Sequence, residues 1–418
     1  VERLTQLPPS ADLRPQCPPV YDQGQLGSCF PPGTHVRLAD GSQCKIEEVR
    51  LLERVVTAEG RTGVVSALMA RPVTDGLVCL RLWGHNTLRC TRDHPILTRR
   101  GYVPAVKVKP TDYVAIPRYA AEETEMLYTE QYLERRQRIA YSGTKWYAGV
   151  QGRGGITVQV STVPETIRLS PGFGRIIGLF LAEGSTDRTK VVWNFHIKER
   201  ETLAAELVGL LQEELGIEAR VQIRSGSSTC NVVAYGTAWA MLFERICGTG
   251  AGMKRLDAVL SSGPGSFLEA VLDGWLAGDG WMRDAGHFGV TISHDLALAM
   301  FDIACFLGRK PGLNHGRGVP NRWVKSRQPR YTVGMHSDAE DYHRCQDEAH
   351  LWRRVREVTE EPYAGPVYNM TVTGDNSYVA ECIGVHNCTA NAIGAAIQFD
   401  RMKQNLQPNF FPSRLFIY

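Results

Sequence analysis

Apolar and polar side chains alternate in residues 191–198, which predicts a strand with one largely polar face. Apolar residues at helical spacing follow at about 199–215 and predict a helix. A second alternating stretch comes next, in which Arg220 and Arg224 share the polar side. This pattern predicts a hairpin that presents basic side chains on one face.

The same order of elements returns later in the chain. Alternation at 288–292 predicts a strand, and the spacing at 294–307 predicts a helix. Residues 304–337 contain no Asp or Glu, and their basic side chains are Arg309, Lys310, Arg317, Arg322, Lys325, Arg327 and Arg330. Such a face can neutralise phosphates, although a charge run is more often a solvated surface. The weak repeat indicates two related halves.

Three other stretches are less regular. Residues 122–138 are rich in charge and predict a helix, whereas residues 143–155 are rich in glycine and predict a linker. Near the end, residues 390–406 carry apolar side chains at helical spacing. These stretches therefore add a charged helix, a linker and a C-terminal helix to the expected elements.

Composition sets limits on the class of protein. A chain of 418 residues has room for about two to four domains, each able to bury a core. The net charge of +3 implies no partner by itself, and the lack of a run of about 18 apolar residues argues against a membrane span. The 11 cysteines lack the spacing of a disulfide framework, so we expect free thiols in a reducing, cytoplasmic compartment. A start at Val1 is what we expect of a fragment or a processed chain.

Two short runs at opposite ends of the chain carry residue types that can cut and rejoin a backbone. Gly-Ser-Cys at 27–29 presents the thiol of Cys29, and His-Asn-Cys at 386–388 places Asn387 directly before Cys388. An asparagine amide can attack its own carbonyl carbon, and a thiol can take over an acyl group. The two runs therefore predict a chain that edits itself.

The residues around these runs form four blocks. After Cys29 come a Gly-Thr turn, a strand and an Asp-Gly hairpin; a Thr-x-x-His run ends at His94; and two closing blocks occupy 367–380 and 383–388. In this order the blocks resemble those of class 1 inteins. The resemblance implies a mostly-β splicing domain, the horseshoe-shaped Hint fold, whose two ends converge so that acyl transfer can occur.

The resemblance implies the roles at the first junction. Cys29 attacks the Ser28 carbonyl and converts that peptide bond to a thioester. His94 would protonate the departing nitrogen of Cys29, and Thr91 would help to polarise the Ser28 carbonyl. Histidine suits this task because its pKa lets it give and take a proton near neutrality.

The resemblance also implies the roles at the second junction. Cys388 attacks the thioester and takes over the N-terminal segment, and Asn387 then cyclises with assistance from His386. The new thioester finally rearranges to an amide, and no cofactor is required. Each step replaces one difficult amide cleavage by an easier acyl transfer.

Two positions of the closing blocks depart from the family pattern. Asn369 stands where the family usually carries Asp, and Asn376 stands where it usually carries His. An amide can orient groups by hydrogen bonds but cannot take up a proton as a carboxylate does. We therefore expect slower or less coupled splicing, with Asp375 as a substitute for the missing carboxylate.

Two stretches inside the frame, residues 176–184 and 272–280, resemble the paired motifs of LAGLIDADG homing endonucleases. Small residues four positions apart in each motif share one helix face, so two such helices could pack backbone to backbone. Glu183 and Asp279 would emerge side by side at the helix ends and hold Mg²⁺. Two ordinary glycine-containing core helices are the alternative.

This second resemblance implies double-stranded DNA, the homing site of an intein-less allele, as partner of a monomeric chain. Lys254 resembles the lysine that the family often places near the scissile phosphate. The expected DNA contacts come from the basic side chains of both halves: Arg220, Arg224, Arg309, Lys310, Arg317, Arg322, Lys325 and Arg327. Basic side chains supply phosphate contacts, and strands in the major groove read base edges.

The flanks resemble the start of a papain-like cysteine peptidase once residues 29–387 are removed. By this resemblance Gln23 supplies an oxyanion donor and Cys388 becomes the peptidase nucleophile. The peptidase would be incomplete, because the His and Asn that the family needs far downstream are missing.

The sequence thus predicts a multi-domain chain in which a mostly-β splicing domain is interrupted by an α+β endonuclease with two αββαββα-like halves. The expected segments are the N-terminal flank 1–28, splicing segments 29–118 and 356–387, a linker or DNA-recognition insert 119–168, an endonuclease 169–350 and the C-terminal flank 388–418. Two alternatives stay open, namely a peptidase that retains a regulatory insertion, and autocleavage without ligation. Splicing differs from the retained insertion at Asn387, which only splicing needs. The Cys388 that follows Asn387 argues against autocleavage.

Overall fold

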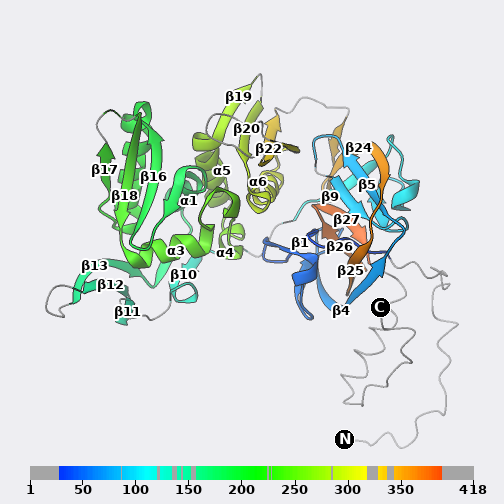
Figure 1. Ribbon diagram of the computed structural model, residues 1–418, viewed down its shortest axis with the longest axis horizontal. Coiled ribbons are helices and arrows are strands. Elements are labelled where there is room, and N and C mark those ends of the chain that lie inside the picture. The colour runs from blue at the N-terminus through cyan, green and yellow to red at the C-terminus, as the bar shows by residue number, and fades with distance from the viewer. Residues whose placement is uncertain are drawn as a thin grey trace, which may run out of the picture.

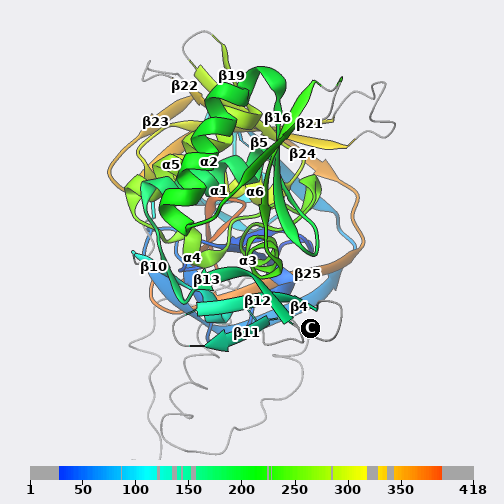
Figure 2. The same ribbon diagram turned by 90° about the vertical axis from the view of Figure 1, so that its left-hand side faces the viewer.

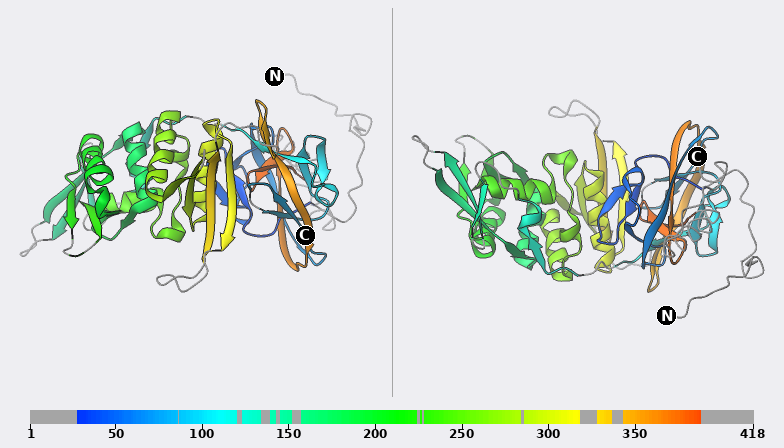
Figure 3. Two further views of the ribbon diagram at one scale, coloured as in Figure 1. Left: turned by 90° about the horizontal axis from the view of Figure 1, so that it is seen from above. Right: turned by 90° about the horizontal axis from the view of Figure 1, so that it is seen from below.

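The computed structural model describes residues 28–85, 87–119, 123–133, 139–142, 145–151, 157–223, 226, 228–283, 286–317, 328–336 and 343–387. These residues form two units that lie end to end (Figures 1 and 3). The β unit combines residues 28–119 with 343–387, and the central unit comprises residues 123–336. The prediction that one domain interrupts another therefore corresponds to the arrangement of the chain.

Strands from both segments of the β unit alternate within its sheets. The first segment contributes β1 (His35–Arg37), β2 (Gln43–Lys45), β3 (Arg54–Val56), β4 (Thr62–Val73), β5 (Leu77–Leu82), β6 (Thr87–Cys90), β7 (Pro95–Thr98), β8 (Gly101–Pro104) and β9 (Tyr113–Pro117). The second contributes β23 (Arg344–Gln346), β24 (His350–Glu361), β25 (Gly365–Val372), β26 (Ser377–Ala380) and β27 (Ile383–His386). One sheet has the order β2-β1-β26-β27-β7-β9-β24-β5-β6, and a second has the order β25-β4-β3.

This pairing places the two ends of the β unit in one core. β25 pairs along β4, while β27 lies next to β7 through the pair Val385 and Ile96. Phe30 forms an isolated bridge with Tyr368, and its ring is fully buried in the core. The residues next to the two junctions are therefore fixed by strands from the opposite end of the chain.

The second segment of the β unit begins earlier than the sequence predicted. β23 pairs with β24, and the first half of β24 pairs with β9 from His350 to Arg354. Residues 344–355 thus belong to the sheet of the β unit, not to the expected endonuclease segment or the gap before 356. The hydrophobic pattern could not reveal this boundary because it does not identify the partner strand.

The central unit repeats one order of elements. Its first half contains α1 (Pro171–Glu183), β15 (Gly184–Thr186), β16 (Lys190–His196), α2 (Ala205–Leu215), β17 (Arg220–Ile223), β18 (Thr229–Tyr235) and α3 (Thr237–Cys247). After α4 (Ala258–Ser261), the second half contains α5 (Gly265–Asp279), β19 (Gly280–Arg283), β20 (Gly286–Thr291), α6 (His294–Phe306), β21 (Pro311–Arg317) and β22 (Pro329–His336). Each half forms a four-stranded antiparallel sheet, β15-β16-β18-β17 or β19-β20-β22-β21.

Helices α1 and α5 pack against each other, as the view along the long axis shows (Figure 2). They lie between the two sheets (Figure 1). Gly178 and Gly274 lie at the crossing, where a Cβ added to Gly178 would lie 2.8 Å from the Gly274 Cα atom. A Cβ added to Gly274 would lie 2.9 Å from the Gly178 Cα atom. The two backbones are therefore in direct contact, and this contact aligns the C-terminal ends of both helices.

The region between β9 of the β unit and α1 of the central unit differs from the prediction. The charged stretch 122–138 was expected to be helical, but its described residues form β10 (Met126–Tyr128) and a 3-10 turn at Thr129–Gln131. β10 pairs with β14 (Thr166–Arg168), and Leu127 is buried in the core of the central unit. Pairing and burial override the local charge pattern here. The neighbouring strands β11 (Ile139–Ser142), β12 (Lys145–Gln151) and β13 (Thr157–Pro164) form a small sheet.

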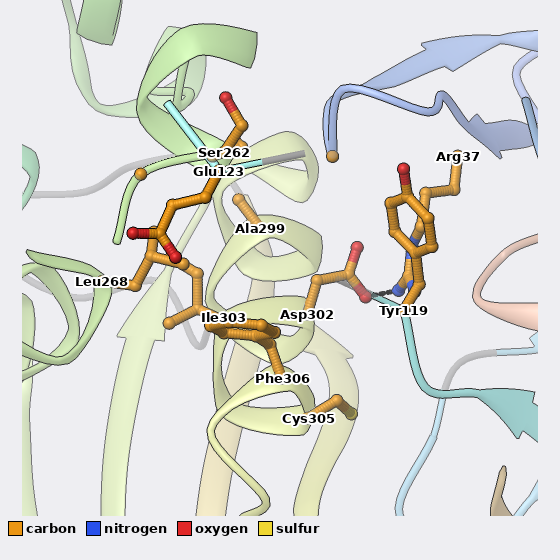
Figure 4. Close-up of a pocket in the computed structure, with 13 residues that line it drawn as sticks. Arg37, Tyr119, Glu123, Ser262, Leu268, Ala299, Asp302, Ile303, Cys305 and Phe306 are labelled. Carbon is orange, nitrogen blue, oxygen red and sulfur yellow. Dashed lines mark ion pairs between the residues drawn. The ribbon is translucent and has the colours of Figure 1, made fainter. Parts of the chain in front are cut away.

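The β unit contacts the central unit through α6. Arg37 of β1 forms an ion pair with Asp302 of α6, and Gln43 of β2 donates a hydrogen bond of 2.5 Å to the same carboxylate. Arg37, Tyr119 and Asp302 are among the residues that line a cavity of about 250 Å³. Figure 4 shows the ion pair between Arg37 and Asp302 at this cavity. No helix in the described part of the chain is long and apolar enough to cross a membrane.

The crossing of α1 and α5 can be tested with a matched pair of glycine substitutions. We expect Gly178→Ala to destabilise the central unit by about 2 kcal/mol or more, because its methyl group would overlap the backbone of α5. Gly209→Ala in α2 should be neutral or stabilise by up to about 1 kcal/mol, since a Cβ there has no neighbour within 4 Å. Chemical denaturation followed by tryptophan fluorescence measures both free energies of unfolding. A Gly178→Ala variant as stable as Gly209→Ala would contradict the close contact.

Candidate active sites

The Ser28–Cys29 peptide bond is buried inside the β unit. Ser28 is 3% and Cys29 is 4% exposed. The amide N–H of Cys29 donates to Thr91 Oγ1 at 2.8 Å, and the amide N–H of Thr91 donates to the Cys29 carbonyl at 2.9 Å. These two contacts fix the backbone of Cys29 against the turn that precedes β7.

The carbonyl oxygen of Ser28 accepts a hydrogen bond from Asn369 Nδ2 on β25. The orientation of this amide is set from its other end, because Asn369 Oδ1 accepts from the Tyr378 hydroxyl at 2.6 Å and from the Met370 amide at 2.7 Å. The sequence predicted that Thr91 would polarise the Ser28 carbonyl. In the structure Thr91 instead contacts the nitrogen side of the bond, and Asn369 contacts the oxygen.

His94 lies in the same buried site. Its backbone N–H donates to the Thr91 carbonyl at 3.1 Å, and its ring lies 4.2 Å from the ring of Phe30. Neither ring nitrogen has a hydrogen-bond partner among the described residues. Burial, and to a lesser degree the neighbouring His386, lowers the pKa of His94 to about 3. The ring is therefore neutral at pH 7, and its nitrogens remain available for a reacting group.

The second junction lies at the end of β27. Asn387 is fully buried, and its side-chain Nδ2 donates to the Val372 carbonyl at 3.1 Å. His386 Nδ1 lies 2.6 Å from the Asn387 carbonyl oxygen, which can only accept, so this nitrogen carries the proton. The histidine thus contacts the carbonyl group that would be attacked during cyclisation.

Asn369 and Asn376, the two departures from the family pattern, lie at different junctions. Asn369 lies at the first junction. Asn376 adopts a positive φ of 52°, and its backbone carbonyl accepts a hydrogen bond from the Asn387 backbone N–H at 2.8 Å, next to the second junction. Asp375 accepts from the Thr57 hydroxyl at 2.7 Å and pairs with Arg61. Burial would raise the pKa of Asp375, but these contacts outweigh it and hold the pKa below its usual range. A carboxylate with such partners is a weak base, so the geometry does not favour the expected substitute role.

Glu183 and Asp279 lie at the C-terminal ends of α1 and α5. A Cβ added to Gly278 would lie 3.0 Å from Glu183 Cγ, so the Glu183 side chain lies directly beside the end of α5. Burial and the charge of Glu183 raise the pKa of Asp279 to about 7, and burial also raises the pKa of Glu183. The two half-buried carboxyl groups therefore repel each other when both are ionised.

Lys254 contacts the end of the first of these helices. It is 3% exposed, and its Nζ donates to the carbonyl oxygens of Phe180 at 2.6 Å and Gly184 at 2.8 Å. Burial lowers the pKa of Lys254 to about 8, while nearby groups that include Asp279 and Glu183 raise it. The ammonium group thus caps α1 from within the core, which the sequence did not reveal because 254 lies far from 180 along the chain.

The expected DNA-contact residues have different surroundings. Arg220 is exposed on β17, whereas Arg309 is half-buried and pairs with Glu269 of α5 at 3.2 Å. Lys310 is half-buried at the start of β21, the strand that ends at Arg317. The exposed faces also carry apolar side chains that the sequence analysis did not single out: Val221, Ile223, Trp281 and Met282. Several expected site residues lie outside the described part of the chain: Gln23, Arg224, Arg322, Lys325, Arg327 and Cys388.

Curated relatives align with most of this chain. An iron–sulfur cluster assembly SufBD family protein of Mycobacterium tuberculosis is 25% identical in an alignment of 408 positions that covers 89% of this chain and 44% of that protein. An ATP-dependent DNA helicase of Thermococcus kodakarensis is 26% identical in an alignment of 257 positions that covers 54% of this chain and 22% of the helicase. The chain thus spans less than half the length of these relatives.

Solved structures resemble parts of the chain. The crystal structure of I-DmoI in complex with DNA and Mn is 11% identical and covers 40% of this chain and 90% of I-DmoI, with a TM-score of 0.30. The solution structure of a bacterial intein-like domain from Clostridium thermocellum is 23% identical and covers 22% of this chain and 67% of that domain, with a TM-score of 0.20.

A family model matches most of the chain. The model describes the intein splicing domain and matches residues 37–387. This interval runs from the last residue of β1 to Asn387 and includes the central unit. The chain belongs to the intein splicing domain family.

Proposed function

We propose that this chain splices itself, excising residues 29–387 and joining residue 28 to residue 388. The observation that carries the proposal is the environment of the Ser28–Cys29 peptide bond. Asn369 donates to its carbonyl oxygen and Thr91 accepts from its N–H, in a buried site that also holds the ring of His94. An ordinary peptide bond between two core residues requires no such set of side chains.

In the first step the Cys29 thiol gives up its proton and the sulfur attacks the Ser28 carbonyl carbon. The new C–S bond replaces the C–N bond, and the nitrogen of Cys29 leaves as an amine. Asn369 stabilises the negative charge on the carbonyl oxygen. His94 takes the thiol proton and returns a proton to the leaving nitrogen. Because burial lowers the pKa of His94, a proton taken up there is readily passed on.

The remaining steps join the flanks. The Cys388 thiol attacks the thioester and releases the Cys29 thiol, so that the segment ending at Ser28 moves to Cys388. Asn387 Nδ2 then attacks its own carbonyl carbon, and His386 Nδ1–H stabilises the charge on the carbonyl oxygen. The C–N bond to Cys388 breaks as a succinimide forms, and the freed amine displaces its own sulfur to give the final amide.

A second activity is proposed for the central unit, namely cleavage of double-stranded DNA. The repeated halves put two antiparallel sheets on either side of the α1–α5 pair, and exposed Arg220 on β17 supplies positive charge on one of these sheets. Basic side chains neutralise phosphates, and β-ribbons fit the major groove. Arg309 contributes less than the sequence suggested, because Glu269 already neutralises its charge. The homing site of an intein-less allele is the proposed substrate.

Glu183 and Asp279 have the chemistry of a site for a divalent cation such as Mg²⁺. Two carboxyl groups that repel each other in a half-buried position are stabilised when a cation neutralises both. The pKa of Asp279 is raised first by burial and then by the charge of Glu183, and a bound cation would offset both effects. The bound cation would supply Lewis-acid activation of water and of the leaving oxygen. Lys254 acts as a positioning residue, because its bonds to Phe180 and Gly184 hold the end of α1 that carries Glu183.

The splicing proposal predicts the products of expression in reducing buffer. Intact mass spectrometry should detect an excised piece of residues 29–387 and a joined peptide of residues 1–28 and 388–418. A chain with Cys29→Ala and Asn387→Ala should stay at full length. Separate flank peptides would instead indicate autocleavage, and an uncleaved parent chain would favour a peptidase that retains its insertion.

The contact between Asn369 and the first junction predicts a defect confined to the first step. In a chain carrying Asn387→Ala, we expect Asn369→Ala to slow thiol-induced cleavage after Ser28 by about 10²–10³-fold, as loss of one oxyanion donor does in other enzymes. The matched control is Asn314→Ala on β21, an exposed asparagine in the central unit. Gel densitometry over time measures the rates. Equal rates for Asn369→Ala and Asn314→Ala would exclude the proposed role of this amide.

The nuclease proposal predicts metal-dependent cleavage of a plasmid that carries the intein-less allele. Glu183→Gln and Asp279→Asn should each abolish cleavage, whereas Glu213→Gln on the exposed side of α2 should not. Since a cation must displace a proton from Asp279 below pH 7, cleavage by the parent should fall about tenfold per pH unit below that value. Full cleavage by either carboxylate variant would show that these residues do not hold the metal.

A further inference from the structure

The contact between the two units contains a buried cluster of groups that neither proposed activity uses. His35 of β1 and Glu381 in the β26–β27 turn belong to the β unit, and His294 at the start of α6 belongs to the central unit. One ligand atom from each of these residues lies within 4.8 Å of the others. The side chains of His35 and Glu381 are 8% and 10% exposed, and that of His294 is 24% exposed. We propose that this cluster binds a divalent transition-metal ion such as Zn²⁺, which would link the β unit to the central unit.

The ligand distances fit the proposal. His35 Nδ1 lies 3.2 Å from Glu381 Oε1, and His294 Nε2 lies 3.6 Å from Glu381 Oε2. A tetrahedral Zn²⁺ site with bonds of about 2.0–2.1 Å has ligand atoms about 3.3 Å apart. The rings of His35 and His294 meet at 83° with centroids 4.5 Å apart, so both nitrogens face the carboxylate without stacking. Two imidazoles and one carboxylate form a three-ligand set with a fourth position open to solvent.

The Asp295 carboxylate contacts His35, the first proposed ligand, through the ring nitrogen that does not face Glu381. His35 Nε2 lies 3.0 Å from Asp295 Oδ1, and His35 Nδ1 lies 3.2 Å from Glu381 Oε1. A bound cation would replace the proton between Nδ1 and Glu381, while Nε2 keeps its proton and its bond to Asp295. Histidines that bind metals usually donate their other ring N–H to a carboxylate in this way, which fixes the tautomer and the ring orientation. Asp295 is 59% exposed, so the cluster lies next to solvent and an ion can enter from that side.

The strained backbone of the β26–β27 turn indicates that the side-chain contacts of Glu381 hold this residue in the turn. Ala380 pairs with Ile383, so Glu381 and Cys382 form a two-residue hairpin loop. Their φ values are +47° and +64°, a region where such loops prefer Asn and Gly. A Glu-Cys pair is unfavourable there, and such local strain persists only where other contacts require it. Two sets of contacts hold the turn in this conformation. Glu381 contacts His35 and His294, and Cys382 contacts Asp302.

The site lies on the hairpin that carries the second junction. β27 runs from the turn at Glu381–Cys382 to His386, and Asn387 follows. A metal ion held by His35, His294 and Glu381 would tie this hairpin to α6. The proposal concerns metal binding alone, so its test does not depend on whether the chain splices.

The test uses the full chain with Cys29→Ala and Asn387→Ala, which keeps it intact and removes one competing thiol. We expect one equivalent of Co²⁺ to bind with visible d–d absorption and without the charge-transfer band of a thiolate ligand. His294→Phe keeps the ring that contacts His35 and Tyr331, and Glu381→Gln keeps the shape of the carboxylate. Both should weaken binding at least tenfold, and Asp295→Asn should weaken it about 10–100-fold. His287→Phe, which replaces an exposed histidine of β20, is the matched control and should bind as the parent does.

Two results would overturn the proposal. One is equal Co²⁺ affinity in the parent, His294→Phe and Glu381→Gln. The other is sulfur scattering from bound metal in an X-ray absorption spectrum of the parent with Zn²⁺, which would place the metal on cysteines elsewhere. The spectrum requires no variant, so the proposal remains testable even if a substitution prevents folding. Scattering from two imidazoles and oxygen, with no sulfur, is the expected result.

Discussion

The pairing of strands from opposite ends of the chain is the constraint on which the rest of the structure depends. β25 runs along β4, and β24 joins β9 to β5, so neither segment of the β unit can complete a sheet alone. The bridge between Phe30 and Tyr368 then fixes the first junction beside Asn369. The entropy of closing a loop grows only slowly with its length, so a folded central unit can occupy the interval between 119 and 343 at little added cost.

The sequence was most informative where chemistry depends on residues that are close along the chain. The Thr-x-x-His run and the terminal His-Asn pair were identified by their resemblance to intein blocks, and the structure places both beside the buried junctions. The contact between Asn369 and the Ser28 carbonyl was not expected, because Asn369 lies on β25 and Thr91 lies in the turn before β7. A sequence pattern does not show which side chain meets the carbonyl oxygen. The described residues of the charged stretch, 123–133, form a strand and a turn, since pairing with β14 and burial in the core compete with its helical preference. The cluster of His35, His294 and Glu381 had no sequence signal at all.

Buried ionisable groups recur at each functional position, and burial has the same physical effect on each. It lowers the pKa values of His94 and Lys254 and raises that of Asp279, in every case because a low-dielectric environment disfavours the charged form. Such groups reduce stability, so the surrounding packing must compensate. At the end of α1 the compensation is visible, because two backbone carbonyls hold the Lys254 ammonium and the contact of Gly178 with Gly274 fixes the helix pair.

The amide at 369 changes the balance between the steps of splicing. A carboxylate beside the first junction could accept protons, but it would also place negative charge next to a thiol that must ionise and a carbonyl that must become an oxyanion. An amide donates to that oxygen without adding charge, and Tyr378 and the Met370 amide orient it by occupying its own oxygen. In the proposed mechanism, Asn369 therefore favours thioester formation, and the later proton transfers are left to His94 and His386. Coupling between the junctions then depends on how the shared sheet positions these two histidines, because the pKa of His94 already responds to the charge of His386.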